Sequence, residues 1–335
     1  MQGHLSAALQ NVEQVAGGVV IDIPSDAFFT GILAIYVVGG VAIVTTLVIT
    51  FVRTWHPTSR ERLVNRHALR ANLVVPEALR PALEHQLAMR GRGGIIGGLV
   101  GLAAVMLLFR PWEYPPVNLG LAGAPLSIGL AMLGTQLGAI LGGALARRAL
   151  PLNGAVSRVT PIGLTDLVAG VELRMAAVAA AVAVALPTLL LVVTALPSTD
   201  ASESITASAA PLALLGLGSG ALFLALPAIA RRLTRRRALL GDTSALAWSD
   251  ALAAQSLRDL LWVIASVGGL AGFSSLMAMG VALPSEANVA AMIWMNVSAY
   301  AGVVLLLLLI ALVLVRSPER HVQRTLWPEF AIDAQ

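Results

Sequence analysis

Seven apolar runs constrain the fold of this 335-residue chain more than any other feature. A helix needs about 20 apolar residues to cross the hydrocarbon core of a bilayer. Apolar residues make up 57% of the chain and charged residues only 12%, which is about half the charged share of a typical soluble domain. The runs cover residues 28–52, 93–109, 119–146, 175–196, 212–230, 261–283 and 291–315. The sequence therefore predicts an all-α integral membrane protein, with a seven-helix transmembrane bundle over residues 28–315.

The arginines predict how this bundle is oriented. The chain has no lysine, so all 22 of its basic residues other than histidine are arginines. If the N-terminus is outside, 21 of them fall in the cytoplasmic segments and only Arg110 lies outside. Because cytoplasmic loops of membrane proteins carry the excess of basic residues, we expect the C-terminus to be cytoplasmic. The same segments are expected to contact anionic lipid of the inner leaflet.

Three segments outside the apolar runs complete the predicted organisation. Residues 1–27 are expected to form an external amphipathic segment, because leucine and valine recur there at helical spacing. Residues 53–92 are expected to form one or two amphipathic helices on the inner leaflet, broken near Pro76 and Pro81. The alternative for this loop is a solvated charged linker. Residues 316–335 are expected to be a cytoplasmic tail.

A recurring pattern suggests three parallel two-helix repeats after the first run. In three places an acid and an arginine lie eight residues apart, and an apolar run follows. The three segments are Glu84–Arg92, Asp166–Arg174 and Asp250–Arg258. Each would lead into its hairpin from the cytoplasmic side.

Two interpretations of this pattern are open. In the first, the segments are helix starts, with Thr165 and Ser249 as N-caps and Asp166 and Asp250 favoured by the positive end of the helix dipole. In this interpretation the arginines extend toward the headgroups. In the second, the six charged residues form a cytoplasmic platform on which a partner protein docks.

Several chemistries are not expected in this chain. Cysteine is absent, which excludes disulfides and iron–sulfur clusters, and the missing lysine excludes a P-loop. No ionisable residue lies within an apolar run away from its ends, although proton-coupled transporters and ion pumps normally need one. All five histidines lie outside the runs. We therefore expect no enzyme activity, no cofactor and no metal site, and nothing in the sequence indicates a nucleic-acid partner.

Some uncharged residues within the runs are candidates for helix contacts. Gln136, Asn296 and Ser298 either pack by interhelical hydrogen bonds or line a substrate path. Glycines four residues apart place two small residues on one helix face and let helices approach closely. Such glycines are Gly94, Gly97, Gly98, Gly101, Gly134, Gly138, Gly142, Gly216, Gly220, Gly268 and Gly272. They predict a tightly packed bundle or helices that pack against another subunit.

The segment Ser249–Arg258, which leads into an apolar run, resembles a feature of uncharacterised bacterial multi-pass membrane proteins that are encoded with the ATPase of an ABC transporter. The resemblance implies a permease-like subunit in the bacterial cytoplasmic membrane, energised by a separate cytoplasmic ATPase. The alternative is a non-transporting scaffold or assembly subunit of a larger membrane complex. Either function implies other protein subunits as partners.

Overall fold

The computed structural model describes residues 38, 41–42, 44–109, 123–148, 162–195, 203–235, 243–282, 297 and 320–328. Within them the chain is helical and contains no strand. The predicted external segment, about half of the first apolar run, all of the seventh run except residue 297, and both Asn296 and Ser298 lie outside the described residues.

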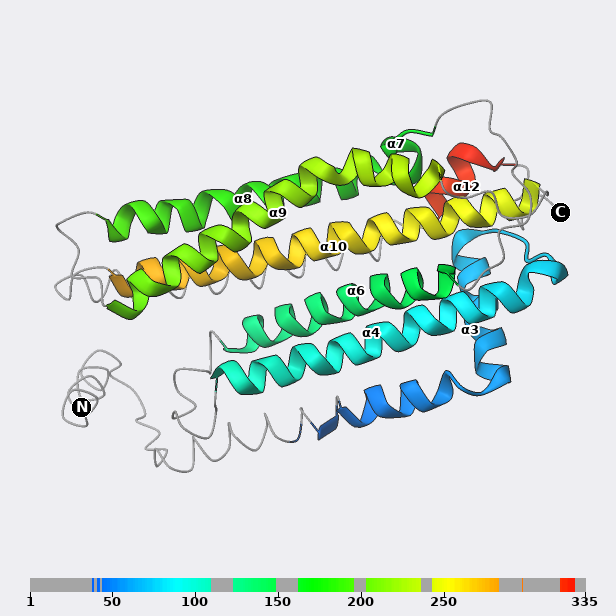
Figure 1. Ribbon diagram of the computed structural model, residues 1–335, viewed down its shortest axis with the longest axis horizontal. Coiled ribbons are helices and arrows are strands. Elements are labelled where there is room, and N and C mark those ends of the chain that lie inside the picture. Colours follow the sequence, from blue (N-terminus) through cyan, green and yellow to red (C-terminus); the bar gives the residue numbers. More distant parts are fainter. Residues whose placement is uncertain are drawn as a thin grey trace, which may run out of the picture.

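Five long helices run alongside one another in Figure 1. They are α4 (Arg80–Phe109), α6 (Gly123–Arg148), α8 (Gly170–Thr194), α9 (Glu203–Arg235) and α10 (Thr243–Ala282). In the described part of the chain, four stretches are long and apolar enough to cross a membrane. These stretches are Gly129–Ala146, Gly170–Thr194, Ala209–Leu233 and Ala245–Leu276. They correspond to the third to sixth predicted runs, and the second run forms the latter part of α4.

Two of these helices begin earlier than the sequence suggested. Helix α9 starts at Glu203, ahead of residue 212, where the fifth run begins, and Pro211 lies inside it. Helix α10 starts at Thr243, far ahead of residue 261, where the sixth run begins. The predicted N-cap role of Ser249 is therefore wrong, because Ser249 lies inside α10 and its hydroxyl donates to the Leu246 carbonyl at 2.8 Å.

The shorter elements gather at one end of the bundle, on the right in Figure 1. They are α3 (Pro57–Ala71), the 3₁₀ helix η1 (Glu77–Leu79), α7 (Leu164–Leu167) and α12 (Arg320–Leu326). Together with the adjoining parts of α4, α8, α9 and α10 they form what we call the polar end. Helix α3 lies crosswise to the long helices and ends at Asn72, whose left-handed conformation (φ 55°) is one that asparagine tolerates.

The predicted amphipathic loop contains the helix α3 and a break around Pro76. Pro81 breaks nothing, because it is the second residue of α4, where proline is tolerated. The apolar side of α3, with Val64 and Ala68, packs against residues of α4 and α10 rather than facing away from the chain. This buried side anchors α3 to the bundle.

Glycines bring α4 and α6 into backbone contact. A Cβ atom added to Gly97 would overlap the carbonyl oxygen of Gly134, and one added to Gly138 would overlap that of Gly93. Gly101 and Gly142 make the same kind of contact one turn further along, against Leu130 and Met89. The six residues Gly93, Gly97, Gly101, Gly134, Gly138 and Gly142 therefore form a continuous seam, which we call the glycine seam. The predicted pair Gly94 and Gly98 lies beside this seam and contacts Thr135.

Small residues also position α8 against its two neighbours. A Cβ on Gly216 of α9 would overlap the carbonyl of Ala183. A Cβ on Gly268 of α10 would overlap that of Ala179. Gly220 and Gly272 face valine side chains of α8. The predicted glycines of α9 and α10 thus lie at helix contacts within the chain.

Replacing Gly138 with alanine should destabilise the bundle. The added methyl group has no space between α6 and α4, and overpacking of this kind costs about 1–3 kcal/mol. The matched control is Gly218→Ala in α9, where nothing lies within 4 Å of the new Cβ. There the higher helix propensity of alanine should leave the stability unchanged or raise it by up to about 1 kcal/mol. Thermal unfolding in mild detergent measures both variants, and equal melting temperatures for the two would contradict a close-packed seam.

Candidate functional site

The first half of α10 is the centre of the polar end. Almost every described side chain from Ala245 to Leu261 is buried, although this segment lies ahead of residue 261, where the predicted sixth run begins. Trp248 is only 1% exposed, and its indole Nε1 donates to the Val74 carbonyl at 2.8 Å. Residues of α3, of the turn after it and of α4 surround this tryptophan. The segment is therefore the core of a folded unit, not a surface loop.

Two neighbouring residues of α10 make ion pairs with two different helices. Arg258 contacts Glu172 of α8 at 3.3 Å, and Asp259 pairs with Arg90 of α4. The side chains of Asp259 and Arg90 are only 8% and 13% exposed. Charges this far from water are costly unless they are paired, so each pair fixes the two helices that supply it. Through these two pairs α10 is joined to both α4 and α8.

Glu172 has a second role at the start of α8. The backbone N–H of Ala169 donates to its carboxylate at 3.2 Å, which satisfies a donor that the helix leaves free. The same carboxylate accepts from Nε of Arg258. The start of α8 and the middle of α10 are thus held by one side chain.

The C-terminal helix α12 closes the polar end. Trp327, just after α12, donates from Nε1 to Oδ2 of Asp250 at 2.9 Å. His321 of α12 lies with Nε2 2.9 Å from the carbonyl of Thr165 in α7. The side chain of Val322 is buried among residues of α8, α9 and α10. Helix α12 therefore bridges α7 and α10.

Arg92 joins α4 to the segment that precedes α3. Its Nε donates to the Thr54 hydroxyl at 3.0 Å, and a terminal nitrogen donates to the Thr54 carbonyl at 3.1 Å. The guanidinium carbon also lies 3.8 Å from the ring centroid of Trp55, a cation–π contact. These contacts set the position at which the chain turns from the helix Val44–Arg53 into α3.

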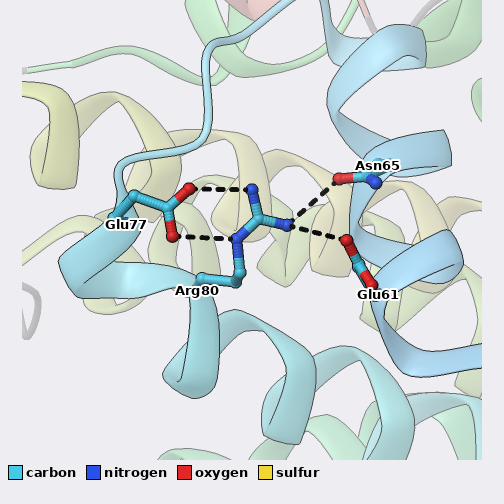
Figure 2. A network of polar contacts seen from close by, with 4 residues as sticks. All are labelled: Glu61, Asn65, Glu77 and Arg80. Carbon is cyan, nitrogen blue, oxygen red and sulfur yellow. Dashed lines mark hydrogen bonds and ion pairs between the residues drawn. The ribbon is translucent and has the colours of Figure 1, made fainter. Parts of the chain in front are cut away.

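A second arginine ties α3 to η1, as Figure 2 shows. Arg80 donates to the carboxylate of Glu77 at 3.2 and 3.3 Å and to the side-chain oxygen of Asn65 at 3.3 Å. Glu61 of α3 lies 3.9 Å from the same guanidinium group. Glu77 and Glu61 are both exposed, so water screens this network and its contribution to stability is small.

His67 of α3 faces the interior of the polar end, with its ring 6.2 Å from that of Trp248. Burial, and to a smaller extent the nearby positive charges of Arg90, Arg70 and Arg258, lower the pKa of His67 from 6.5 to about 4. His67 is therefore neutral at physiological pH.

The six charged residues of the repeating pattern have different surroundings in the structure. Asp250 and Arg258 are buried and engaged within the chain, and Arg92 contacts Thr54 and Trp55. Asp166 accepts from the backbone N–H of Gly163 at 2.7 Å and so stabilises the start of α7. Glu84 is half-buried, whereas Arg174 is exposed.

Two details of the helix-start interpretation need correction. The N-cap of α7 is Gly163, so Thr165 is not the N-cap, and Asp250 is not in the first turn of α10. The predicted site residues do not include Arg90, Glu172, Asp259 or Trp327, which complete the contacts between helices at the polar end. Their role depends on burial and on partners far along the chain, and neither can be inferred from the sequence.

In the described residues, no three histidine, aspartate or glutamate side chains are placed to hold a metal ion. Ser219 of α9 is buried, and its hydroxyl lies 3.4 Å from the Ile264 carbonyl of α10. Gln136 is half-buried on α6. The ion pairs and the hydrogen bonds of Trp248 and Trp327 join different segments of the polar end.

No family model, curated protein or solved structure matches the chain.

Replacing Asp259 with asparagine should destabilise the protein strongly, because Arg90 would keep a buried charge without its partner. Breaking a buried pair in this way costs about 3–5 kcal/mol. The matched control is Glu77→Gln at the exposed pair with Arg80, where the loss should be below about 1 kcal/mol. The double variant Arg90→Met/Asp259→Leu removes both charges and should recover most of the loss. Chemical unfolding in detergent gives the free energy of unfolding of each variant. If Asp259→Asn lowers it no more than Glu77→Gln does, the buried pair is contradicted.

Acid should destabilise the protein partly through His67. Because its folded pKa is lowered from 6.5 to about 4, the unfolded chain binds the proton more readily between these values. The contribution of His67 is complete above pH 6.5 and is lost as the pH falls toward 4. The variant His67→Phe keeps a ring beside Trp248 but has no group that binds a proton there. Its melting temperature should therefore fall less than that of wild type between pH 6.5 and pH 4. Melting curves from pH 4 to pH 8 check this, and identical slopes in both proteins would contradict a buried neutral histidine.

Proposed function

We propose that the chain is the membrane-embedded, permease-like subunit of a multicomponent ABC-type transporter, energised by a separate cytoplasmic ATPase. In this proposal the polar end faces the cytoplasm and the N-terminus lies outside. The observation that carries it is the continuity of α10, which runs without a break from the buried core of the polar end into the apolar bundle.

The ion pairs join α10 to two other helices, so that the three helices can move together. Arg258 links α10 to α8, and Asp259 links it to α4. A displacement of the polar end by a bound partner would therefore act on α4, α8 and α10 together. Concerted movement of helices under an external force is what a transporter driven by a separate ATPase requires.

The distribution of charge supports the cytoplasmic placement of the polar end. The described arginines lie in α3 and α12, in the early parts of α4, α8 and α10, at the ends of α6 and α9, and at Arg53. These parts meet at the polar end in Figure 1. Basic residues favour the cytoplasmic side of a membrane, as the positive-inside rule describes.

The packing of the glycines reduces support for the scaffold alternative. That alternative relied on glycine faces that could bind another subunit. In the structure the glycine seam joins α4 to α6, and Gly216 and Gly268 contact α8. These faces are therefore occupied within the chain.

Affinity purification from native membranes in mild detergent, followed by mass spectrometry, tests the proposal. We expect a P-loop ATPase to be recovered in stoichiometric amount, because the chain has no lysine with which to build its own P-loop. Recovery of other integral membrane subunits without an ATPase would overturn the transporter proposal in favour of the scaffold.

Charge reversals then test how the ATPase docks. Arg174 is the most exposed of the six pattern residues, so Arg174→Glu should reduce the amount of ATPase recovered without lowering the melting temperature. The matched control is Arg324→Glu on α12, which reverses another exposed arginine. If wild type and Arg174→Glu recover equal amounts of ATPase, Arg174 is not part of the docking surface.

A further inference from the structure

Three arginines form a stripe along the outer side of α3. Arg62, Arg66 and Arg70 are four residues apart, so they lie on one helix face, and all three are exposed. Val64 and Ala68 are buried on the opposite side of the helix. The stripe therefore points away from the rest of the chain.

The stripe is uncompensated within the described residues. No ion pair there involves these three arginines, and the nearest acid along α3, Glu61, faces Arg80 instead. Like charges one turn apart on a helix repel each other and destabilise it. A bound anion at the stripe would remove this repulsion.

The position of α3 indicates where such an anion would be found. Helix α3 begins just after the helix Val44–Arg53, which ends the first apolar run. Trp55, at the junction, is 57% exposed, and tryptophan favours the headgroup level of a bilayer. Because α3 lies crosswise to the long helices, its whole length stays near that level (Figure 1).

An apolar side chain lies on the same exposed face as the stripe. Leu69 is 63% exposed between Arg66 and Arg70. A basic face that also carries an apolar residue at headgroup level is typical of segments that bind anionic lipid. A soluble acidic protein would explain the arginines but not why the exposed surfaces of Leu69 and Trp55 lie beside them.

We propose that Arg62, Arg66 and Arg70 form a docking surface for the phosphate groups of anionic phospholipids. Guanidinium groups bind phosphate through paired, charge-assisted hydrogen bonds. The bound lipid would fix α3 against the membrane and neutralise the stripe. This inference requires a membrane location, but it does not depend on the transporter proposal.

The test measures lipid binding by the purified full-length protein in mild detergent. Phosphatidylglycerol is added in increasing amounts, and the rise in melting temperature gives an apparent affinity. The variant is Arg62→Gln/Arg66→Gln/Arg70→Gln. The matched control is Arg174→Gln/Arg232→Gln/Arg324→Gln, which removes three exposed arginines of the polar end from three different helices. Phosphatidylcholine, inorganic phosphate and polyglutamate serve as comparison ligands.

We expect wild type to be stabilised by phosphatidylglycerol and not by the three comparison ligands. The stripe variant should lose affinity on the order of 100-fold, since each basic residue near an anionic surface contributes roughly fivefold. Arg66→Gln alone should lose roughly fivefold. The control variant should bind nearly as wild type does.

Three results would overturn the proposal. Equal loss in the control and stripe variants would show that general positive charge, not the stripe, attracts the lipid. Equal stabilisation by phosphatidylcholine would show that charge plays no part. Stabilisation by polyglutamate or by inorganic phosphate, lost in the stripe variant, would assign the surface to an acidic protein or to a free anion.

Discussion

The paired charges of Arg258 and Asp259 are the constraint on which the rest of the polar end depends. Each would be costly to bury alone, and each is buried because a partner on another helix compensates for the lost water. Arg258 requires Glu172 and thereby the start of α8, while Asp259 requires Arg90 and thereby the early part of α4. The positions of three helices are thus coupled by two adjacent residues.

Along the apolar part of the bundle, close packing of small residues holds the helices together. Lipid gives little hydrophobic drive for helices to associate, so contact depends on close packing. The glycine seam supplies it between α4 and α6, and alanines of α8 meet glycines of α9 and α10. Ion pairs at one end and small residues along the length therefore hold the same helices in complementary ways.

The sequence predicts the apolar part of this architecture well, because hydropathy and glycine spacing are local properties. The third to sixth runs correspond to the four apolar stretches, and Gly138 lies at a close contact as its spacing indicates. The polar end could not be predicted in this way. Residues 243–260 were expected to lie outside the sixth run, with a helix start at Ser249, but contacts with residues far along the chain, such as Glu172 and Trp327, make them part of a buried helix. The predicted N-cap at Ser249 failed for the same reason.

Cysteine accessibility tests most directly whether the first half of α10 is the core of the polar end. The chain has no cysteine, so Ser249→Cys introduces a single thiol at a site that is 2% exposed, and Thr58→Cys introduces one on the exposed side of α3. Both proteins are treated with a water-soluble maleimide in mild detergent and again after denaturation. We predict rapid labelling of Thr58→Cys in the folded protein and labelling of Ser249→Cys only after denaturation. Equal labelling rates in the folded proteins would contradict a buried α10 core.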